Sequence, residues 1–107
     1  MITVYGGGSW GTALAHVLAS AGREVSLLLR DEAVAAAVNE RHENPRYLPG
    51  LPLAPSLRAV TDSSVLGASD VWVLAVPCQN QRGALEAART LLRPETVIVN
   101  AAKGIEL

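Results

Sequence analysis

The sequence predicts an α/β fold, a doubly wound and mainly parallel sheet, on three observations. Short apolar runs alternate with segments of helical period, a glycine cluster follows the first apolar run, and the length of 107 residues suits one domain. Parallel strands need long crossover connections, and the helical segments supply them. We therefore expect β-α units built around a single sheet.

The first half of the chain predicts two β-α units. The first strand is expected over residues 2–5, and a helix follows it, whose buried stripe is expected to be Leu14, Val17, Leu18 and Ala21. A second strand is expected over 24–29, where an unbroken apolar run suits burial on both faces. A second helix is expected over 31–40, with Asp31 as its N-cap.

The second half is interrupted by a proline-rich segment. Four prolines between residues 42 and 55 exclude a regular element that runs through this segment, so we expect an extended loop or a very short strand between turns. The elements expected beyond it are a strand over 57–60, a helical turn over 61–67 capped by Thr61 or Asp62, a strand over 71–76, a helix over 81–92 and a strand over 96–100. Because the chain stops soon after the last strand, we expect a fragment whose substrate-binding half lies in later sequence.

Composition argues against several classes of function. A formal net charge of −1 offers no broad basic face, so we expect no nucleic-acid partner. No apolar run is long enough to cross a bilayer, so no membrane partner is expected. A single cysteine, Cys78, can form no intrachain disulfide, and no charged-then-apolar leader opens the sequence, which favours the cytoplasm.

The glycine cluster carries the most specific chemistry. Gly6, Gly8 and Gly11 form G-x-G-x-x-G between the first strand and the first helix. Gly6 permits a tight turn, Gly8 lets the backbone approach a pyrophosphate, and Gly11 allows close packing of helix and strand. The helix N-terminus adds unpaired N–H groups and a partial positive charge. This pattern predicts a Rossmann-type dinucleotide-binding domain.

Two basic residues lie at the expected ligand edge of the sheet. Arg30 stands at the end of the second strand, where strict NAD sites carry an acid, so it favours NADP or the use of both cofactors. The alternative for Arg30 is a solvated strand end. Lys103, the only lysine, follows the last strand and could bind a substrate oxyanion, and the alternative is an exposed surface lysine.

The remaining candidates are weaker. His16, His42 and Cys78 have no partner at a ligand-like or nucleophile-activating spacing, so we expect no metal site and treat Cys78 as an apolar filler. Trp72 is expected in the core, whereas Trp10, inside the glycine loop, could cover the pyrophosphate or shape the substrate mouth.

Four motifs spread along the chain also resemble one family. They are Gly6 to Ala15, the segment from Asn39 through Tyr47 to Pro52, Ala75-Val76-Pro77, and Lys103-Gly104-Ile105-Glu106. Together they resemble the dinucleotide loop, the proline-rich segment around "Y-L-P-G", the "A-V-P" strand end and the "K-G-I-E" motif of bacterial NAD(P)-dependent glycerol-3-phosphate dehydrogenases. The chain departs from the family at Leu28, where an aromatic residue is common, and at Cys78, where serine is usual.

The resemblance implies a set of site residues. The cofactor contacts it implies are Gly6, Gly8, Ser9, Trp10, Gly11, Arg30, Tyr47, Pro77 and Lys103. Lys103 would also contact the substrate in the catalytic site, while the proton-transferring lysine would belong to a C-terminal helical domain that residues 1–107 do not include.

The same resemblance implies a function. Residues 1–107 would be the NAD- or NADP-binding domain of an enzyme that interconverts sn-glycerol 3-phosphate and dihydroxyacetone phosphate for phospholipid synthesis. This piece would be inactive alone, and the full-length protein could form a homodimer. Two alternatives are the cofactor domain of a hydroxyacid or 6-phosphogluconate-type dehydrogenase, which the proline-rich motif disfavours, and a stand-alone NAD(P)-sensing module, which Lys103 disfavours.

Overall fold

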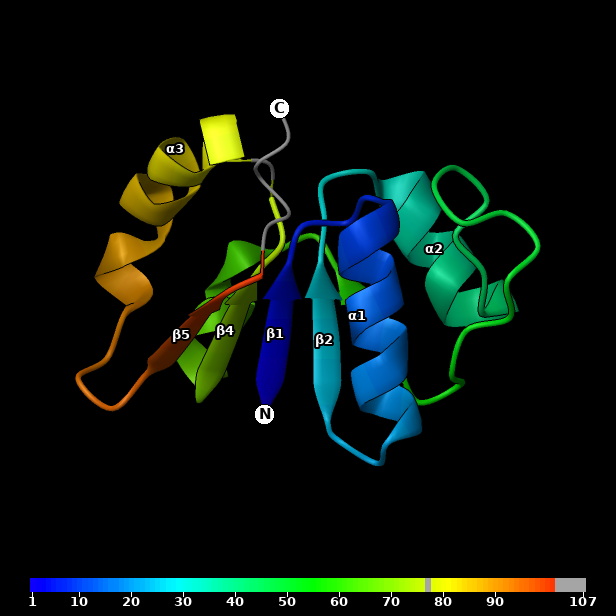
Figure 1. Cartoon of the computed structure of the whole chain (residues 1–107), viewed down its shortest axis with the longest axis horizontal. Coiled ribbons are helices and arrows are strands. Elements are labelled where there is room, and N and C mark those ends of the chain that lie inside the picture. Colours follow the sequence, from blue (N-terminus) through cyan, green and yellow to red (C-terminus); the bar gives the residue numbers. More distant parts are fainter. Residues whose placement is uncertain (77, 102–107) are drawn as a thin grey trace.

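A computed structural model describes residues 1–76 and 78–101, and it forms one five-stranded sheet (Figure 1). The strands are β1 (Ile2–Tyr5), β2 (Val25–Leu28), β3 (Arg58–Val60), β4 (Val71–Leu74) and β5 (Val97–Asn100). They run parallel in the order β3-β2-β1-β4-β5. This order is that of the first five strands of a Rossmann fold, in which the direction of the strand order reverses between β1 and β4. The predicted fold class is confirmed.

Helices cover both faces of the sheet. They are α1 (Ser9–Ser20), α2 (Glu32–Arg41) and α3 (Cys78–Ala88), together with the short 3₁₀ helices η1 (Ser63–Ala68) and η2 (Arg89–Leu91). The loop 42–55 contains no regular strand or helix, as predicted, although Asn44 and Leu48 form an isolated bridge. No helix in the described part of the chain is long and apolar enough to span a membrane.

Strand alternation divides the core into two clusters. Val25 and Leu27 of β2 point into the larger cluster, with residues of α1 and α2, whereas Leu28 points into a smaller one. Trp72 is the largest side chain of the smaller cluster, and it is 1% exposed, as predicted. Its indole nitrogen donates to the Leu66 carbonyl at 2.9 Å, which satisfies the one polar atom of the ring.

The buried face of α1 differs from the predicted apolar stripe. Its fully buried residues are the small ones, Gly11, Thr12, Ala15 and Ala19, whereas Val17 is 61% exposed. Ala21 is exposed as well, and Leu14 and Leu18 pack only at the margin of the larger cluster. The glycine loop brings α1 so close to the sheet that only small side chains fit between them, and the larger side chains are displaced to the sides.

Several element boundaries differ from the prediction by one to three residues. Strand β3 begins at Arg58 rather than residue 57, β4 ends at Leu74 rather than 76, and α3 begins at Cys78 rather than 81. The predicted end of the last helix is the separate 3₁₀ turn η2. Asp62, one of the two predicted caps, accepts from the Ser64 amide at 2.9 Å and caps η1.

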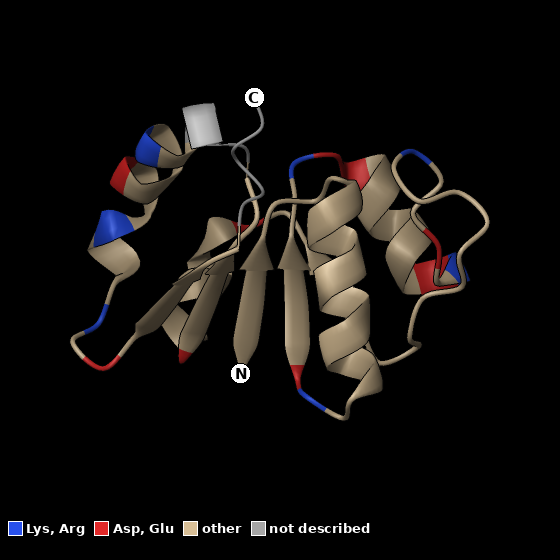
Figure 2. Ribbon diagram, viewed as in Figure 1, with Lys and Arg blue, Asp and Glu red and all other residues tan. Residues whose placement is uncertain are grey.

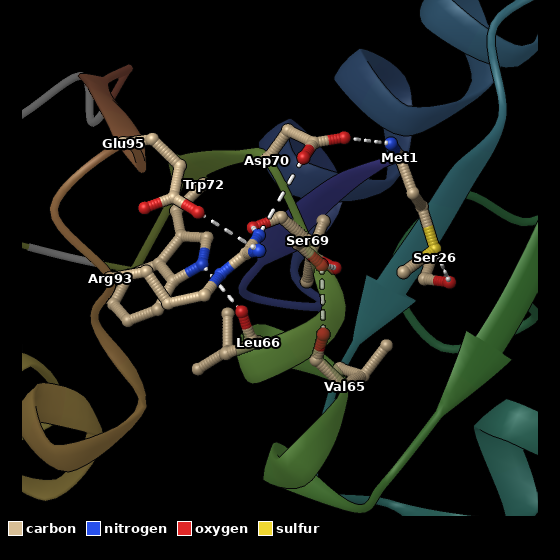
Figure 3. A network of polar contacts seen from close by, with 10 residues as sticks. Met1, Ser26, Val65, Leu66, Ser69, Asp70, Trp72, Arg93 and Glu95 are labelled. Carbon is tan, nitrogen blue, oxygen red and sulfur yellow. Dashed lines mark hydrogen bonds and ion pairs between the residues drawn. The ribbon is translucent and has the colours of Figure 1, made fainter.

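A polar network joins the amino ends of the strands (Figure 3). The N-terminal ammonium donates to the Asp70 carboxylate at 2.7 Å, and the Arg93 guanidinium donates to the Ser69 carbonyl at 2.8 Å. The ammonium hydrogen bond and its charge lower the pKa of Asp70, with a smaller contribution from Arg93. These contacts close one end of the sheet, and the cleft described below lies at the other.

Candidate functional site

A cleft of about 620 Å³ opens at the carboxyl ends of β1, β2 and β4. Most of the predicted cofactor contacts line it, namely Gly6, Gly8, Ser9, Trp10, Gly11, Arg30 and Tyr47. Two predicted contacts, Pro77 and Lys103, lie outside the described residues. The carboxyl edge beside a topological switch point is where open α/β sheets bind ligands.

Two glycines of the loop are required by the fold itself. Gly6 has a φ of +128°, and a Cβ there would lie 2.9 Å from the Ala75 carbonyl carbon. A Cβ on Gly11 would lie 1.8 Å from the Gly6 oxygen, a separation that no packing adjustment accommodates. The tight turn predicted at Gly6 and the close packing predicted at Gly11 therefore have direct steric causes.

Gly8 has a different environment. Nothing lies within 4 Å of the position that its Cβ would occupy, and its φ of −73° and ψ of −170° suit any residue. Glycine at this position is therefore not required by the packing of the described residues. The open space lies on the cleft, where a bound group could approach the backbone.

Gly7, which the motif leaves unspecified, is also constrained. A Cβ there would lie 2.4 Å from the Leu29 Cβ, because the end of the β2 segment presses against the loop. Sequence reasoning missed this role, since the contact joins segments more than 20 residues apart and leaves no local pattern.

The N-termini of α1 and α2 differ in a way that bears on anion binding. Helix α1 has Gly8 as its N-cap, no side-chain cap hydrogen bond and no acid in its first turn. Helix α2 is capped by Asp31, as predicted, and Asp31 accepts from the Ala33 and Val34 amides at 2.9 and 3.3 Å. The positive end of α2 is thus compensated by its own side chains, whereas no side chain caps the N-terminus of α1.

Asn44 fastens the proline-rich loop to the glycine loop. Its side chain is fully buried and donates to the Gly7 carbonyl at 3.2 Å and to the Thr12 hydroxyl at 2.9 Å. Its carbonyl oxygen accepts from the amides of Arg46 and Tyr47 at 3.2 and 3.1 Å. One amide group therefore fixes both loops, a role that sequence reasoning did not assign.

A second contact joins the same two loops. The Ser9 hydroxyl donates to the Tyr47 carbonyl at 2.7 Å. Both residues were predicted cofactor contacts, and the structure places them against each other on the wall of the cleft. The segment 44–47 is consequently part of the site. The prolines around it predicted only that this part of the chain forms no regular structure.

His16 anchors the far end of the proline-rich loop. Its Nδ1 accepts from the Ala54 amide at 3.1 Å, and the neighbouring Leu53 is buried. His16 therefore holds the end of the proline-rich loop against α1.

Trp10 reaches from the start of α1 to the segment that follows β5. Its side chain is 40% exposed, lines the cleft, and donates from the indole nitrogen to the Ala101 carbonyl. The ring therefore fixes the glycine loop against the C-terminal end of β5, close in sequence to Lys103. This position agrees with an indole that shapes the mouth of the cleft.

Charge on the cleft wall comes from residues 30, 31 and 46. Arg30 is exposed, and its guanidinium forms no ion pair or hydrogen bond with the other residues that the structure describes. Arg46, which sequence reasoning overlooked, pairs with Asp31 at 3.3 Å. Figure 2 shows the basic and acidic segments side by side where the chain leaves β2.

Comparison with known proteins assigns the chain to a family. The family described as NAD-dependent glycerol-3-phosphate dehydrogenase N-terminus matches residues 1–107. The chain belongs to this family. The resemblance predicted from the four sequence motifs is thereby confirmed.

Individual glycerol-3-phosphate dehydrogenases also match this chain in sequence or in structure. The enzyme of Desulfovibrio desulfuricans, named glycerol-3-phosphate dehydrogenase (NAD(P)+), is 58% identical over 105 residues, which cover 98% of this chain and 31% of the relative. The crystal structure of the Coxiella burnetii enzyme superimposes with a TM-score of 0.86 at 31% identity, over 97% of this chain and 32% of that one. The Saccharomyces cerevisiae enzyme gives 0.87 at 26% identity, over 99% and 34%. The chain thus spans about a third of the length of the relatives it matches.

Proposed function

We propose that residues 1–107 are the cofactor-binding domain of an oxidoreductase that interconverts sn-glycerol 3-phosphate and dihydroxyacetone phosphate with NAD or NADP. The reaction would supply glycerol 3-phosphate for phospholipid synthesis. The relatives that support this proposal carry the name glycerol-3-phosphate dehydrogenase (NAD(P)+).

The observation that carries the proposal is the space beside Gly8. This residue has an ordinary backbone conformation and no neighbour within 4 Å of a Cβ, and it begins a helix without an acidic or capping side chain. A pyrophosphate placed there would accept hydrogen bonds from the first-turn amides of α1 and meet the positive end of the helix. The cleft therefore fits a dinucleotide.

The chemistry divides between the cofactor and the protein. The nicotinamide ring of the bound cofactor supplies the hydride. The glycine loop, Ser9 and Trp10 would hold and orient the dinucleotide, and Arg30 would lie at its adenosine end. Lys103 would attract the oxygens of the substrate as a point charge. The residue that transfers the proton would lie in the part of the relatives that this chain does not match.

The proposal also includes the surroundings of the enzyme. We place it in the cytoplasm, acting on a small molecule without a nucleic-acid or membrane partner, and able to form a homodimer in the full-length form. The net charge of −1 supports the absence of a nucleic-acid partner.

Calorimetric titration of the chain with NADH and NADPH tests cofactor binding. Gly8→Val should abolish detectable binding of both cofactors, because its side chain fills the space meant for the pyrophosphate. Gly83→Val is the matched control, since Gly83 in α3 also has nothing within 4 Å of a Cβ but does not line the cleft. Equal cofactor affinity for Gly8→Val and the unaltered chain would overturn the assignment.

A chimera tests the activity. Residues 1–107 would replace the matching N-terminal third of the Desulfovibrio desulfuricans enzyme, and oxidation of NADH and NADPH with dihydroxyacetone phosphate would be followed. We expect turnover by the chimera and none by residues 1–107 alone. A chimera that folds and binds the cofactor without turnover would contradict the proposed reaction. Turnover by residues 1–107 alone would contradict the placement of the proton-transferring residue outside this chain.

A further inference from the structure

Arg46 is held on the wall of the cleft by contacts on several sides. Its Nη1 lies 3.3 Å from Oδ2 of Asp31, and its guanidinium carbon lies 5.3 Å from the centroid of the Tyr47 ring. Its backbone amide donates to the buried side chain of Asn44. The Arg46 side chain is nevertheless 61% exposed, so the guanidinium retains donors that face solvent.

Asp31 uses both of its carboxylate oxygens. Oδ1 caps α2 through the amides of residues 33 and 34, and Oδ2 accepts from Arg46. Without Arg46, Oδ2 would be an available acceptor with an uncompensated negative charge directly beside Arg30. A carboxylate in that position favours a ribose hydroxyl and repels a phosphate.

The charges that line this part of the cleft therefore depend on Arg46. Among the described lining residues the charged ones are Arg30, Asp31 and Arg46, with a sum of +1. Removing Arg46 brings that sum to zero and leaves the acid next to the one remaining cation. A phosphomonoester carries close to two negative charges at neutral pH, so it responds strongly to this difference.

We propose that Arg46 is a specificity-determining residue that, together with Arg30, binds the 2′-phosphate of NADP(H) while it neutralises Asp31. This inference rests on the proposed cofactor binding above. Stacking on Tyr47 and pairing with Asp31 hold the guanidinium ready, so little side-chain entropy is lost when the phosphate binds. For NAD(H), which lacks this phosphate, Arg46 only shields an acid that could accept from the ribose.

The test is the affinity of the chain for each cofactor, measured calorimetrically for Arg46→Gln. We expect NADPH binding to weaken about tenfold to a hundredfold, as the loss of charged hydrogen bonds implies. NADH binding should stay equal or become tighter, because Oδ2 of Asp31 becomes available. The dependence of the NADPH dissociation constant on salt should also decrease.

Two controls separate this effect from a general change of charge or fold. Arg89→Gln removes an arginine that also pairs with a carboxylate, Glu86 at 3.5 Å, but that does not line the cleft, so both affinities should be unchanged. The double variant with Arg30→Gln should lose less NADPH affinity than the sum of the single losses, because both guanidinium groups contact one phosphate.

The outcomes are distinguishable. If the unaltered chain binds both cofactors and Arg46→Gln changes both affinities equally, or neither, the role of Arg46 is wrong while the proposed function stands. If the unaltered chain binds neither NADH nor NADPH, the proposed function fails and this inference fails with it. Selective loss of NADPH binding supports both.

Discussion

Strands β2 and β5 belong to the same parallel sheet and have similarly apolar sequences, yet their surroundings are opposite. All four residues of β2 are buried, whereas all four of β5 are exposed, with Val97, Ile98 and Val99 at 55, 40 and 45%. Strand β2 lies between two other strands and faces both core clusters. Among the strands that the structure describes, β5 pairs only with β4 (Figure 1).

The difference shows where the molecule can hold a ligand precisely. Most of the cleft comes from the densely packed half, namely the ends of β1 and β2, the start of α1 and the loop around Asn44. The β4–β5 half contributes Ala75, Val76 and Ala84 to the described lining. A site that must orient a flexible dinucleotide benefits from the half whose loops are fixed by buried groups.

The largest expected difference between the halves is in core stability. Leu27→Ala should lower the free energy of unfolding by about 2–5 kcal/mol, because Leu27 is fully buried and its removal leaves a cavity. Val99→Ala on β5 should change it by less than about 0.5 kcal/mol. Urea denaturation of the two variants measures both, and equal losses would break the comparison.

The buried amide of Asn44 should have an intermediate effect. Asn44→Ala leaves the Gly7 carbonyl and the amides of Arg46 and Tyr47 without their partner. We expect the free energy of unfolding to fall by about 1–3 kcal/mol, and NADPH binding to weaken because the two loops separate. Urea denaturation and calorimetry measure the two effects. Unchanged stability and affinity would mean that the loops are held by other contacts.

The smallest effect is expected at the polar network around Asp70. The N-terminal ammonium and Arg93 hold the pKa of Asp70 below 3.8, so this carboxylate stabilises the fold fully above that pH. The contribution disappears as the pH falls through the lower pKa of the folded state. Asp70→Asn should therefore be less stable than the unaltered chain near about pH 7, and the gap should narrow in acid. A constant gap in denaturation experiments would contradict the cause assigned to this pKa.

The sequence predicted what depends on local pattern. The alternation of strands and helices, the turn at Gly6, the close contact at Gly11 and the cap at Asp31 all follow from patterns over a few residues. Each of these features depends on residues that are close together in the sequence, such as those of a left-handed turn or those that pair an unbonded helix amide.

The features that were missed depend on contacts between distant segments. Gly7 is constrained by Leu29, Asn44 bonds to Thr12, and Arg46 reaches Asp31, so no window of a dozen residues includes both partners. The prediction of the buried stripe of α1 was wrong for a related reason. The short distance between helix and sheet leaves room for small side chains but not for Val17. Hydrophobic periodicity predicts a face, and tertiary spacing decides which side chains fit on it.

Amide hydrogen exchange with and without NADPH tests the central claim most directly, because it locates the cofactor on the chain. We predict that NADPH slows exchange in the glycine loop and first turn of α1, residues 8–12, and in the segment 44–47. Exchange in β5, residues 97–100, should change far less. Unchanged exchange in the glycine loop at a saturating concentration of NADPH, or slowing confined to β5, would contradict the account.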